Sequence, residues 1–187
     1  MIVGAGLIGV VQRDVTQRDV TPRDVPSPLA RTHTSADAIP WTTTNRYPEW
    51  FRKTYRYKEL VGGVSAWQSM AGEWKGIPHA EIRMGTLQLD RGAIYPFHAH
   101  PAPELYFVIR GQAKWTVGDE TFTATPGTAI HAPPNTRHQM INTGPETLEL
   151  LFIWWAPGGD ARVLDIASRM LDGWDHPPPK TRDTVIR

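Results

Sequence analysis

The stretch that decides the fold is residues 92–111, GAIYPFHAHPAPELYFVIRG. In an extended strand His98 and His100 project to the same face, because they are two residues apart. Glu104 follows a proline-rich turn, which can bring its carboxylate back toward the two imidazoles. This single stretch therefore supplies three candidate metal ligands.

A second stretch, residues 127–142, GTAIHAPPNTRHQMIN, adds a fourth candidate ligand, His138. Three imidazoles and one carboxylate, with positions left for water or substrate, predict a site for one divalent transition metal ion: Fe, Mn, Zn, Ni or Co. Of the other two central histidines, His131 is expected to face outward or to contact the ligands from behind, and His79 to lie at the surface or in a lid.

Short apolar or alternating runs, separated by turn residues, begin at Ile82. Spacing of this regularity is typical of an antiparallel sandwich or barrel, and Gly118-Asp119 between two runs predicts a hairpin turn. We therefore predict an all-β fold, a small antiparallel β-barrel of jelly-roll type with a few short flanking helices. The predicted strands are 82–90, 104–109, 112–117, 120–123, 128–131, 139–142 and 147–155.

The rest of the chain differs from this pattern. A pentapeptide repeat centred on Arg-Asp-Val, together with several prolines, predicts a disordered N-terminal arm. Aromatic residues then recur as far as Trp74, and this segment is expected to cap the barrel with a helix over 48–60. A short helix is predicted over 161–171. The predicted organisation is an arm (1–40), an aromatic-rich capping segment (41–81), the barrel core (82–157), and a C-terminal helix with an irregular tail (158–187).

Composition narrows the classes of function. The 20 Lys and Arg against 19 Asp and Glu leave a net charge of +1, which provides no long-range field for nucleic acid or an anionic membrane. Cysteine is absent, so thiolate catalysis and Cys-ligated metals are excluded. Met1–Val11 lacks a basic leader and a small-residue cleavage site, so a soluble cytoplasmic protein is expected. The expected partner is a small-molecule substrate, without nucleic acid or membrane, and a homodimer is compatible with the sequence.

The two stretches resemble the paired motifs of the cupin superfamily. The resemblance covers about residues 82–155 and implies a cupin barrel with the four ligands named above. One position departs from the family pattern: Asn135 stands where glycine is usual, and asparagine tolerates a positive φ better than most residues. The first motif matches at Gly92, His98, His100, Glu104 and Gly111 with the family's spacing, and the second at Gly127, Pro133, His138 and Asn142.

Residues near the ligands indicate the chemistry. Tyr106 follows Glu104 by two residues, so in a strand both side chains point to one face. A divalent cation lowers the pKa of a nearby phenol, which makes Tyr106 a candidate base and Tyr95 a second candidate. Neighbouring aromatic and apolar side chains are candidates for substrate binding: Trp115, Trp154, Phe97 and Met140. No cofactor-binding residues other than the metal ligands are predicted.

The order of these residues is similar to that of the cupin-type dimethylsulfoniopropionate lyases. That resemblance implies β-elimination, in which the substrate carboxylate binds the metal, a tyrosine removes the α-proton, and dimethyl sulfide leaves to give acrylate. It implies Tyr106 as the catalytic tyrosine and Tyr95 as a second tyrosine of the site. Aromatic faces also hold a sulfonium cation well. Two alternatives stay open: an Fe(II)-dependent dioxygenase or a metal-dependent isomerase or cyclase, and a non-catalytic cupin that binds a small molecule.

Overall fold

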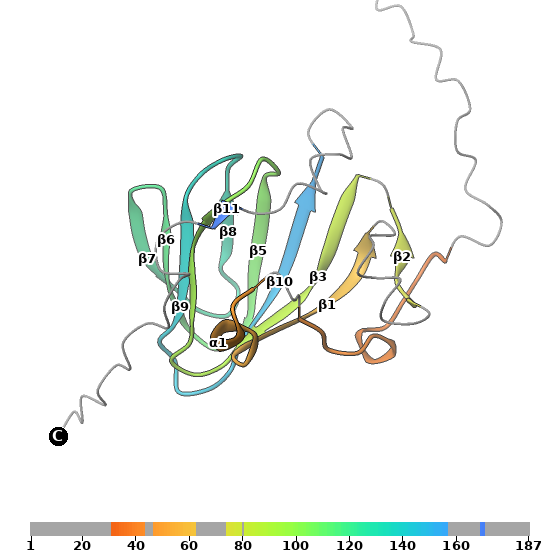
Figure 1. The fold of residues 1–187 in the computed structure, drawn as a ribbon, viewed down its shortest axis with the longest axis horizontal. Coiled ribbons are helices and arrows are strands. Elements are labelled where there is room, and N and C mark those ends of the chain that lie inside the picture. Colours follow the sequence, from red (N-terminus) through yellow and green to blue (C-terminus); the bar gives the residue numbers. More distant parts are fainter. Residues whose placement is uncertain (1–30, 44–46, 63–73, 80, 157–168, 171–187) are drawn as a thin grey trace, which may run out of the picture.

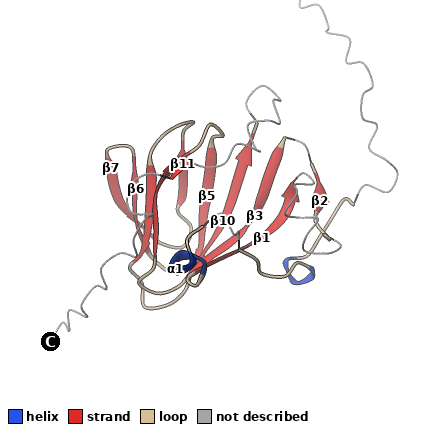
Figure 2. Cartoon of the chain, in the orientation of Figure 1, coloured by secondary structure: helices blue, strands red, loops and turns tan. Residues whose placement is uncertain are grey.

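The strands of the protein form two sheets that face each other, and a single-turn helix, α1 (Glu49–Arg52), lies at one end of them (Figure 1). Figure 2 shows that regular structure is almost all strand, which confirms the predicted all-β fold. Within the part of the chain that is described, no helix is long and apolar enough to cross a membrane. The computed structural model describes residues 31–43, 47–62, 74–79, 81–156 and 169–170.

Among the described residues, the larger sheet has six strands and the smaller has five. The pairings are antiparallel, apart from that of β1 with β2. Sheet A runs β2 (Ile77–Pro78), β1 (Tyr55–Gly62), β3 (Ile82–Leu89), β10 (Leu148–Trp155), β5 (Glu104–Arg110), β8 (Ala129–Ala132). Sheet B runs β11 (Arg169–Met170), β4 (Ile94–Ala99), β9 (His138–Asn142), β6 (Ala113–Val117), β7 (Glu120–Ala124).

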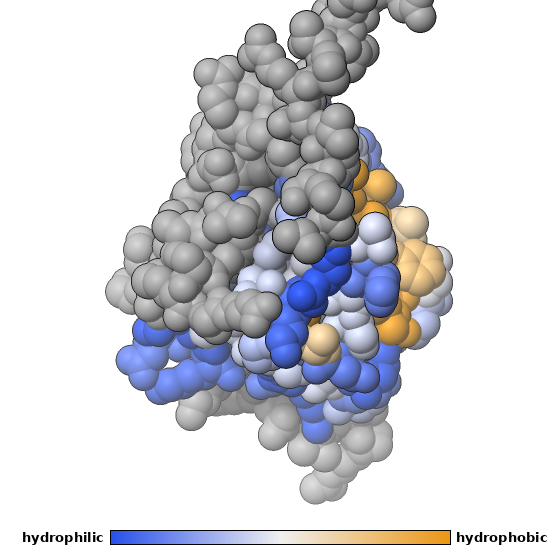
Figure 3. All heavy atoms as spheres, turned by 90° about the vertical axis from the view of Figure 1, so that its right-hand side faces the viewer, coloured by the Kyte–Doolittle hydropathy of each residue, from blue (hydrophilic) through white to orange (hydrophobic). Residues whose placement is uncertain are grey.

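Alternation along strands such as β5 and β9 separates the interior of the barrel from its surface. In β5, Glu104, Tyr106 and Val108 are buried, whereas Leu105 and Phe107 are exposed on the outer face. Figure 3 shows apolar residues gathered along one flank of the molecule. The buried positions of both sheets meet in one hydrophobic cluster, so the side chains that alternate inward also surround the candidate ligands.

The predicted strands of the barrel are confirmed to within a residue or two at their ends. The hairpin at Gly118-Asp119 is confirmed as well, because Val117 pairs with Glu120 and Gly118 has φ 57°. A two-residue hairpin loop needs a positive φ that glycine adopts without strain. Sequence pattern therefore predicted both the strands and this connection.

The helix predicted over 48–60 is wrong beyond its first turn. Helix α1 ends at Arg52, and β1 begins at Tyr55. In β1 the side chains of Tyr55, Tyr57 and Glu59, which lie two residues apart as on one face of a strand, are all buried, and Lys58 is buried as well. Pairing with β3 along its whole length overrides the weaker helical pattern of the segment, so this segment extends sheet A as well as closing one end of the barrel.

The C-terminal end of the predicted disordered arm is ordered. Ala36–Ala38 form a short 3-10 helix, and Ile39 is 5% exposed. The ammonium group of Lys58 in β1 donates a hydrogen bond to the Ala36 carbonyl (2.6 Å) and lies 4.7 Å from the centre of the Trp41 ring. These contacts order residues 31–40 against the edge of sheet A, while residues 1–30 lie outside the described part.

The helix predicted over 161–171 is contradicted where the chain is described. Arg169 and Met170 form β11, which pairs with Ala99 and His98 of β4. The free edge of β4 offers backbone hydrogen bonds to a strand, and this outweighs the apolar period read from the sequence. The remainder of that predicted helix lies outside the described residues.

Candidate metal centre

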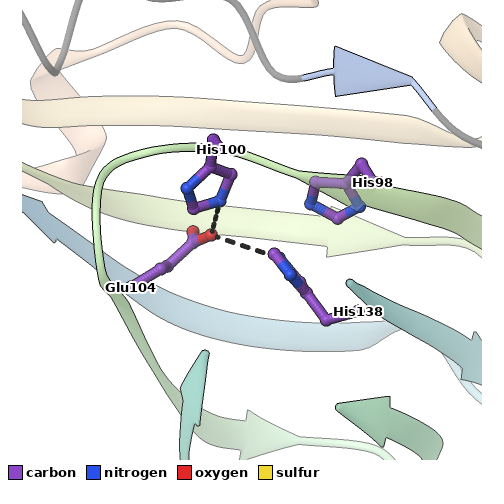
Figure 4. A group of neighbouring side chains, drawn as sticks. All are labelled: His98, His100, Glu104 and His138. Carbon is purple, nitrogen blue, oxygen red and sulfur yellow. Dashed lines mark hydrogen bonds and ion pairs between the residues drawn. The ribbon is translucent and has the colours of Figure 1, made fainter. Parts of the chain in front are cut away.

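The structure brings the four predicted ligands together in the interior of the barrel (Figure 4). His98 lies in β4 and His100 directly follows it, whereas Glu104 opens β5 and His138 opens β9. Their ligand atoms all lie within 4.8 Å of one another, and each residue is at most 2% exposed. Residues that are 40 positions apart in the chain thus meet at one point, and both sheets contribute to it.

The loop before His138 is held in place by the loop that carries His100. The backbone N–H of Asn135 donates a hydrogen bond to the His100 carbonyl (2.8 Å). Asn135 has φ 58°, which confirms that asparagine adopts the positive φ expected at this position. The turn at Asn135 therefore ties the second motif to the first.

All three histidine rings are oriented in the same way, by a hydrogen bond from Nδ1 to a backbone carbonyl oxygen. A carbonyl oxygen can only accept, so Nδ1 carries a hydrogen, and Nε2 is the nitrogen that can bind a metal once any proton on it is released. Histidine ligands in metalloproteins are held by this kind of hydrogen bond, so the donor set fits a divalent ion. The acceptors are Pro96 O for His98 (2.9 Å), Ala102 O for His100 (2.6 Å) and Thr136 O for His138 (2.8 Å).

Electrostatics within the cluster favour a charged Glu104 and a neutral His98. Burial raises the pKa of Glu104, but hydrogen bonds from His100 and His138 outweigh it and lower this pKa to about 2. Burial and the neighbouring His138 and His100 hold the pKa of His98 well below its usual value. Burial lowers the pKa of His100. The hydrogen bond between His100 and Glu104 (2.9 Å) and the charge of that carboxylate have the opposite effect, and the net result is a pKa of His100 above its usual value.

Tyr106 lies directly beside the ligands, as predicted. Its hydroxyl is 3.5 Å from Nε2 of His138, and the residue is 3% exposed. Burial, followed by the charge of Glu104, raises the pKa of Tyr106 well above its usual value. A cation held by the four ligands would oppose the effect of the Glu104 charge, so the state of this phenol depends on the metal.

Two predicted substrate-binding tryptophans also lie at the site. The Trp154 ring stacks on His100 with 4.5 Å between ring centroids, and the Trp115 ring is 4.8 Å from that of Tyr106. Both indole N–H groups are buried without a hydrogen-bond acceptor among the residues that are described. Buried donors are seldom left unpaired, because the loss of hydration is costly, so we expect each of these two donors to have an acceptor beyond the described residues.

The structure places the three remaining predicted residues in different surroundings. Tyr95 is buried with its ring 4.5 Å from that of His98, and fully buried Met140 is its partner in the pairing of β4 with β9. Phe97 does not join them: the Arg137 guanidinium lies 3.6 Å from the centre of its ring. Phe97 is half-buried, and its role in substrate binding stays a prediction.

Two tyrosines of the site were missed by sequence reasoning. The hydroxyl of Tyr47 lies 2.7 Å from that of Tyr95, and the ring of Tyr55 is 5.2 Å from that of Tyr95. The alternation of Tyr55 with Tyr57 could have indicated a strand that faces the interior. No pattern in the sequence points to Tyr47, because it precedes α1 and reaches the site only through the path of the chain.

The other two central histidines lie at the surface, as expected. His131 is exposed, and its ring stacks on Trp155 with 6.1 Å between ring centroids. His79 is exposed too, and its Nδ1 accepts hydrogen bonds from the backbone N–H groups of Glu81 and Ile82. Both side chains are occupied by local contacts.

Comparison with known proteins agrees with this geometry. The family model described as the cupin domain matches residues 85–154. An uncharacterized protein of Methanocaldococcus jannaschii is 30% identical over 96 residues, which cover 46% of this chain and 77% of that protein.

Two solved structures share the fold. The DMSP lyase DddQ of Ruegeria pomeroyi is 22% identical with a TM-score of 0.55, and the match covers 72% of this chain but only 61% of DddQ. The polyketide cyclase RemF of Streptomyces resistomycificus is 16% identical with a TM-score of 0.51, over 67% of this chain and 79% of RemF. At these identities the likeness establishes a shared fold.

Proposed function

Because the chain belongs to the cupin superfamily and buries a tyrosine beside three histidines and a glutamate, we propose that it is a metal-dependent lyase. Its substrate would be a small carboxylate of the dimethylsulfoniopropionate type, cleaved by β-elimination to dimethyl sulfide and acrylate. The observation that carries this proposal is the position of the Tyr106 hydroxyl, 3.5 Å from a candidate ligand atom of His138. The DMSP lyase DddQ, which shares the fold, supports it.

The four ligands would hold one divalent cation. When bound, that ion supplies a Lewis acid, which makes the α-proton of a coordinated carboxylate more acidic and lowers the pKa of a nearby phenol. The part played by the chain is to place the Tyr106 hydroxyl 3.5 Å from Nε2 of His138 and to keep water away, since Tyr106 and all four candidate ligands are buried.

Elimination then needs only one base and one leaving group. The phenolate oxygen of Tyr106 takes the proton from the carbon next to the carboxylate, and the electron pair of that C–H bond forms the double bond of acrylate. The bond from the β-carbon to sulfur breaks, and sulfur keeps the electron pair, so the sulfonium leaves as neutral dimethyl sulfide. Tyr106 returns its proton to water before the next turnover.

The walls of the site suit such a substrate. Trp154 and Trp115 each present a buried indole N–H without an acceptor among the described residues, and a carboxylate oxygen would satisfy such a donor. Their ring faces, together with those of neighbouring tyrosines, attract a sulfonium cation through their quadrupoles.

The test is Tyr106→Phe in protein loaded in turn with Fe(II), Mn, Zn, Ni or Co. We expect wild-type protein to release dimethyl sulfide from dimethylsulfoniopropionate without oxygen. The variant should be slower by about 10²-fold or more with unchanged metal content, because only the base is lost. Tyr57→Phe, which removes the hydroxyl of another buried tyrosine, is the matched control. Equal turnover by the wild type and Tyr106→Phe would show that Tyr106 is not the base.

The same assay separates the alternatives. A dioxygenase would require Fe(II) and consume O₂, whereas elimination is indifferent to oxygen and tolerates several divalent metals. Strict dependence on Fe(II) and O₂ would falsify the lyase proposal. No turnover with any metal, combined with tight binding of the substrate, would support the non-catalytic cupin.

A further inference from the structure

The outer face of sheet A exposes a strip of large apolar side chains on β5. Leu105 is 38% exposed, Phe107 43% and Ile109 46%. Of the large hydrophobic side chains that are exposed in the described part of the chain, only Trp41 lies elsewhere. Contiguous apolar surface is costly to leave in water, so a face of this kind marks a site of interaction.

Pairing between strands extends this strip into a broad surface. Residues that are paired across a sheet point to the same side, so the exposed residues of β5 have neighbours on β10 and β8, and β3 continues the rows. None of the residues in these rows is an acid, a lysine or an arginine. The rows are Met84–Ile153–Leu105–His131, Thr86–Leu151–Phe107–Ala129 and Ile82–Trp155.

The chain itself covers the same side of the sheet at β1. Lys58 continues the row of Thr86 onto β1, yet it is buried. It is buried because the Trp41 ring lies 4.7 Å from its ammonium group, which also donates to the Ala36 carbonyl. On β5 the outer side chains stay exposed, so one part of this face is covered within the chain and the rest is open to a second molecule.

A polar row borders the apolar rows at one end, and its charges are paired within the chain. Arg56 forms an ion pair with Asp90 (2.9 Å). Arg110 forms another with Glu149 (3.2 Å). Two copies of such a face can meet without repulsion, whereas a nucleic acid or a strongly charged protein finds little complementary charge on it. The row is Arg56–Gln88–Glu149–Arg110.

The face is also large enough for a dimer. Strands of a sheet lie about 4.8 Å apart, and residues on one side of a strand repeat every ~6.7 Å. The face formed by β3, β10, β5 and β8 therefore measures about 19 Å by about 27 Å with its polar row, or roughly 500 Å². Two copies would bury about 1,000 Å², which is the lower limit for a specific interface, so a dimer of micromolar affinity is expected.

We propose that the outer face of β3, β10, β5 and β8 is the interface of a homodimer, in which the β5 strands of two copies cross near a two-fold axis. Both copies then present the same uncharged rows to each other, as an isologous interface requires. The inference does not depend on the proposed function. It does concern the candidate centre, because Leu105 directly follows Glu104 in β5, and a second copy would support this strand from behind.

Sedimentation velocity of the full chain, between about 1 and about 200 µM, tests the interface. The wild type should pass from monomer to dimer in this range. Phe107→Glu should weaken the dimer by about 100-fold or more, because two like charges would be buried against each other. Thr123→Glu places the same charge on an exposed position of β7 in sheet B and should dimerise like the wild type. The melting temperature should rise with protein concentration in the wild type but not in Phe107→Glu.

A mixture of Phe107→Glu with Phe107→Lys tests the two-fold packing of β5. It should form a dimer where neither variant does so alone, because opposite charges then meet. Ile109→Glu replaces Phe107→Glu if circular dichroism shows that the latter does not fold. A wild type that stays monomeric throughout would overturn the inference and leave the face to a different partner. A dimer that survives Phe107→Glu, that Thr123→Glu disrupts, or that the mixture does not restore would overturn it as well.

Discussion

Glu104 controls the charge of the candidate centre. Its carboxylate accepts from His100 at 2.9 Å and lies 3.7 Å from Nε2 of His138, and its pKa is about 2, so it is ionised over the whole physiological range. The same carboxylate raises the pKa of His100, whereas His98 stays neutral. In the metal-free protein His100 therefore keeps its proton up to a higher pH than an ordinary histidine does, and a metal ion must displace that proton.

The proton on His100 makes the metal affinity of the protein depend on pH. The pKa of His100 is raised above 6.5 in the folded metal-free protein, so below that raised value the imidazole is protonated and its Nε2 is not free to bind a metal. Affinity should be nearly constant above the raised pKa and fall by about tenfold per pH unit below it, as expected when one proton is released on binding. Zn(II) competition titrations between pH 5.5 and 8 measure this slope.

Glu104→Gln is the comparison variant in the same Zn(II) titration. The variant binds Zn(II) more weakly at every pH, because a charged ligand is lost. It should also show the onset of the slope at a lower pH, because the carboxylate that raises the pKa of His100 is gone. An onset that stays at the same pH in both proteins would mean that a group other than His100 releases the proton.

At the scale of single strands, the sequence was sufficient to predict much of the fold. Alternation in β5 and β10 identified the inward faces, and the spacing of His98, His100 and Glu104 predicted a shared point for the three side chains. These features are local, because a strand with period two fixes the direction of each side chain. The four members of the buried cluster that could hold a metal ion, and the buried tyrosine beside them, could therefore be named before the structure was known.

Features that depend on tertiary contacts could not be predicted. Tyr47 reaches Tyr95 because the chain before α1 crosses the end of the barrel, and no period in the sequence encodes that path. Likewise, β1 and β11 are strands because β3 and β4 offer free edges, while their sequences also satisfy a helical pattern. The irregular register of β4 between Tyr95 and His98 is a further feature that alternation in the sequence does not predict.

The turn at Asn135 offers a test at this scale. Its φ of 58° costs a β-carbon-bearing residue about 1 kcal/mol, which asparagine partly avoids and glycine avoids entirely. Asn135→Ala should therefore be less stable than Asn135→Gly by about 1 kcal/mol, which corresponds to roughly 2–4 °C in Tm for a chain of this size. Thermal unfolding of the metal-free variants followed by circular dichroism measures the difference, and equal melting of the two would show that this φ is not under strain.

For the molecule as a whole, the position of the ligands matters more than their number. His98 and His138 belong to sheet B, whereas Glu104 belongs to sheet A. A cation bound by all of them would connect the two sheets across the interior, in addition to the apolar contacts of the hydrophobic cluster. Such a bound cation would then contribute to the stability of the barrel as well as to its chemistry.

Metal binding should therefore raise the melting temperature of the entire domain. An ion that binds only the folded state stabilises it by about 2.7 kcal/mol at a free concentration of 100 times Kd, or roughly 5–10 °C for a chain of this length. Calorimetry with Zn(II) and with a chelator should show this difference in the wild type and in His131→Ala, whose exposed histidine lies on the outer face of sheet A. In His138→Ala the difference should largely disappear, because the remaining ligands cannot complete the coordination of the ion. A shift of full size in His138→Ala would place the stabilising ion elsewhere in the protein.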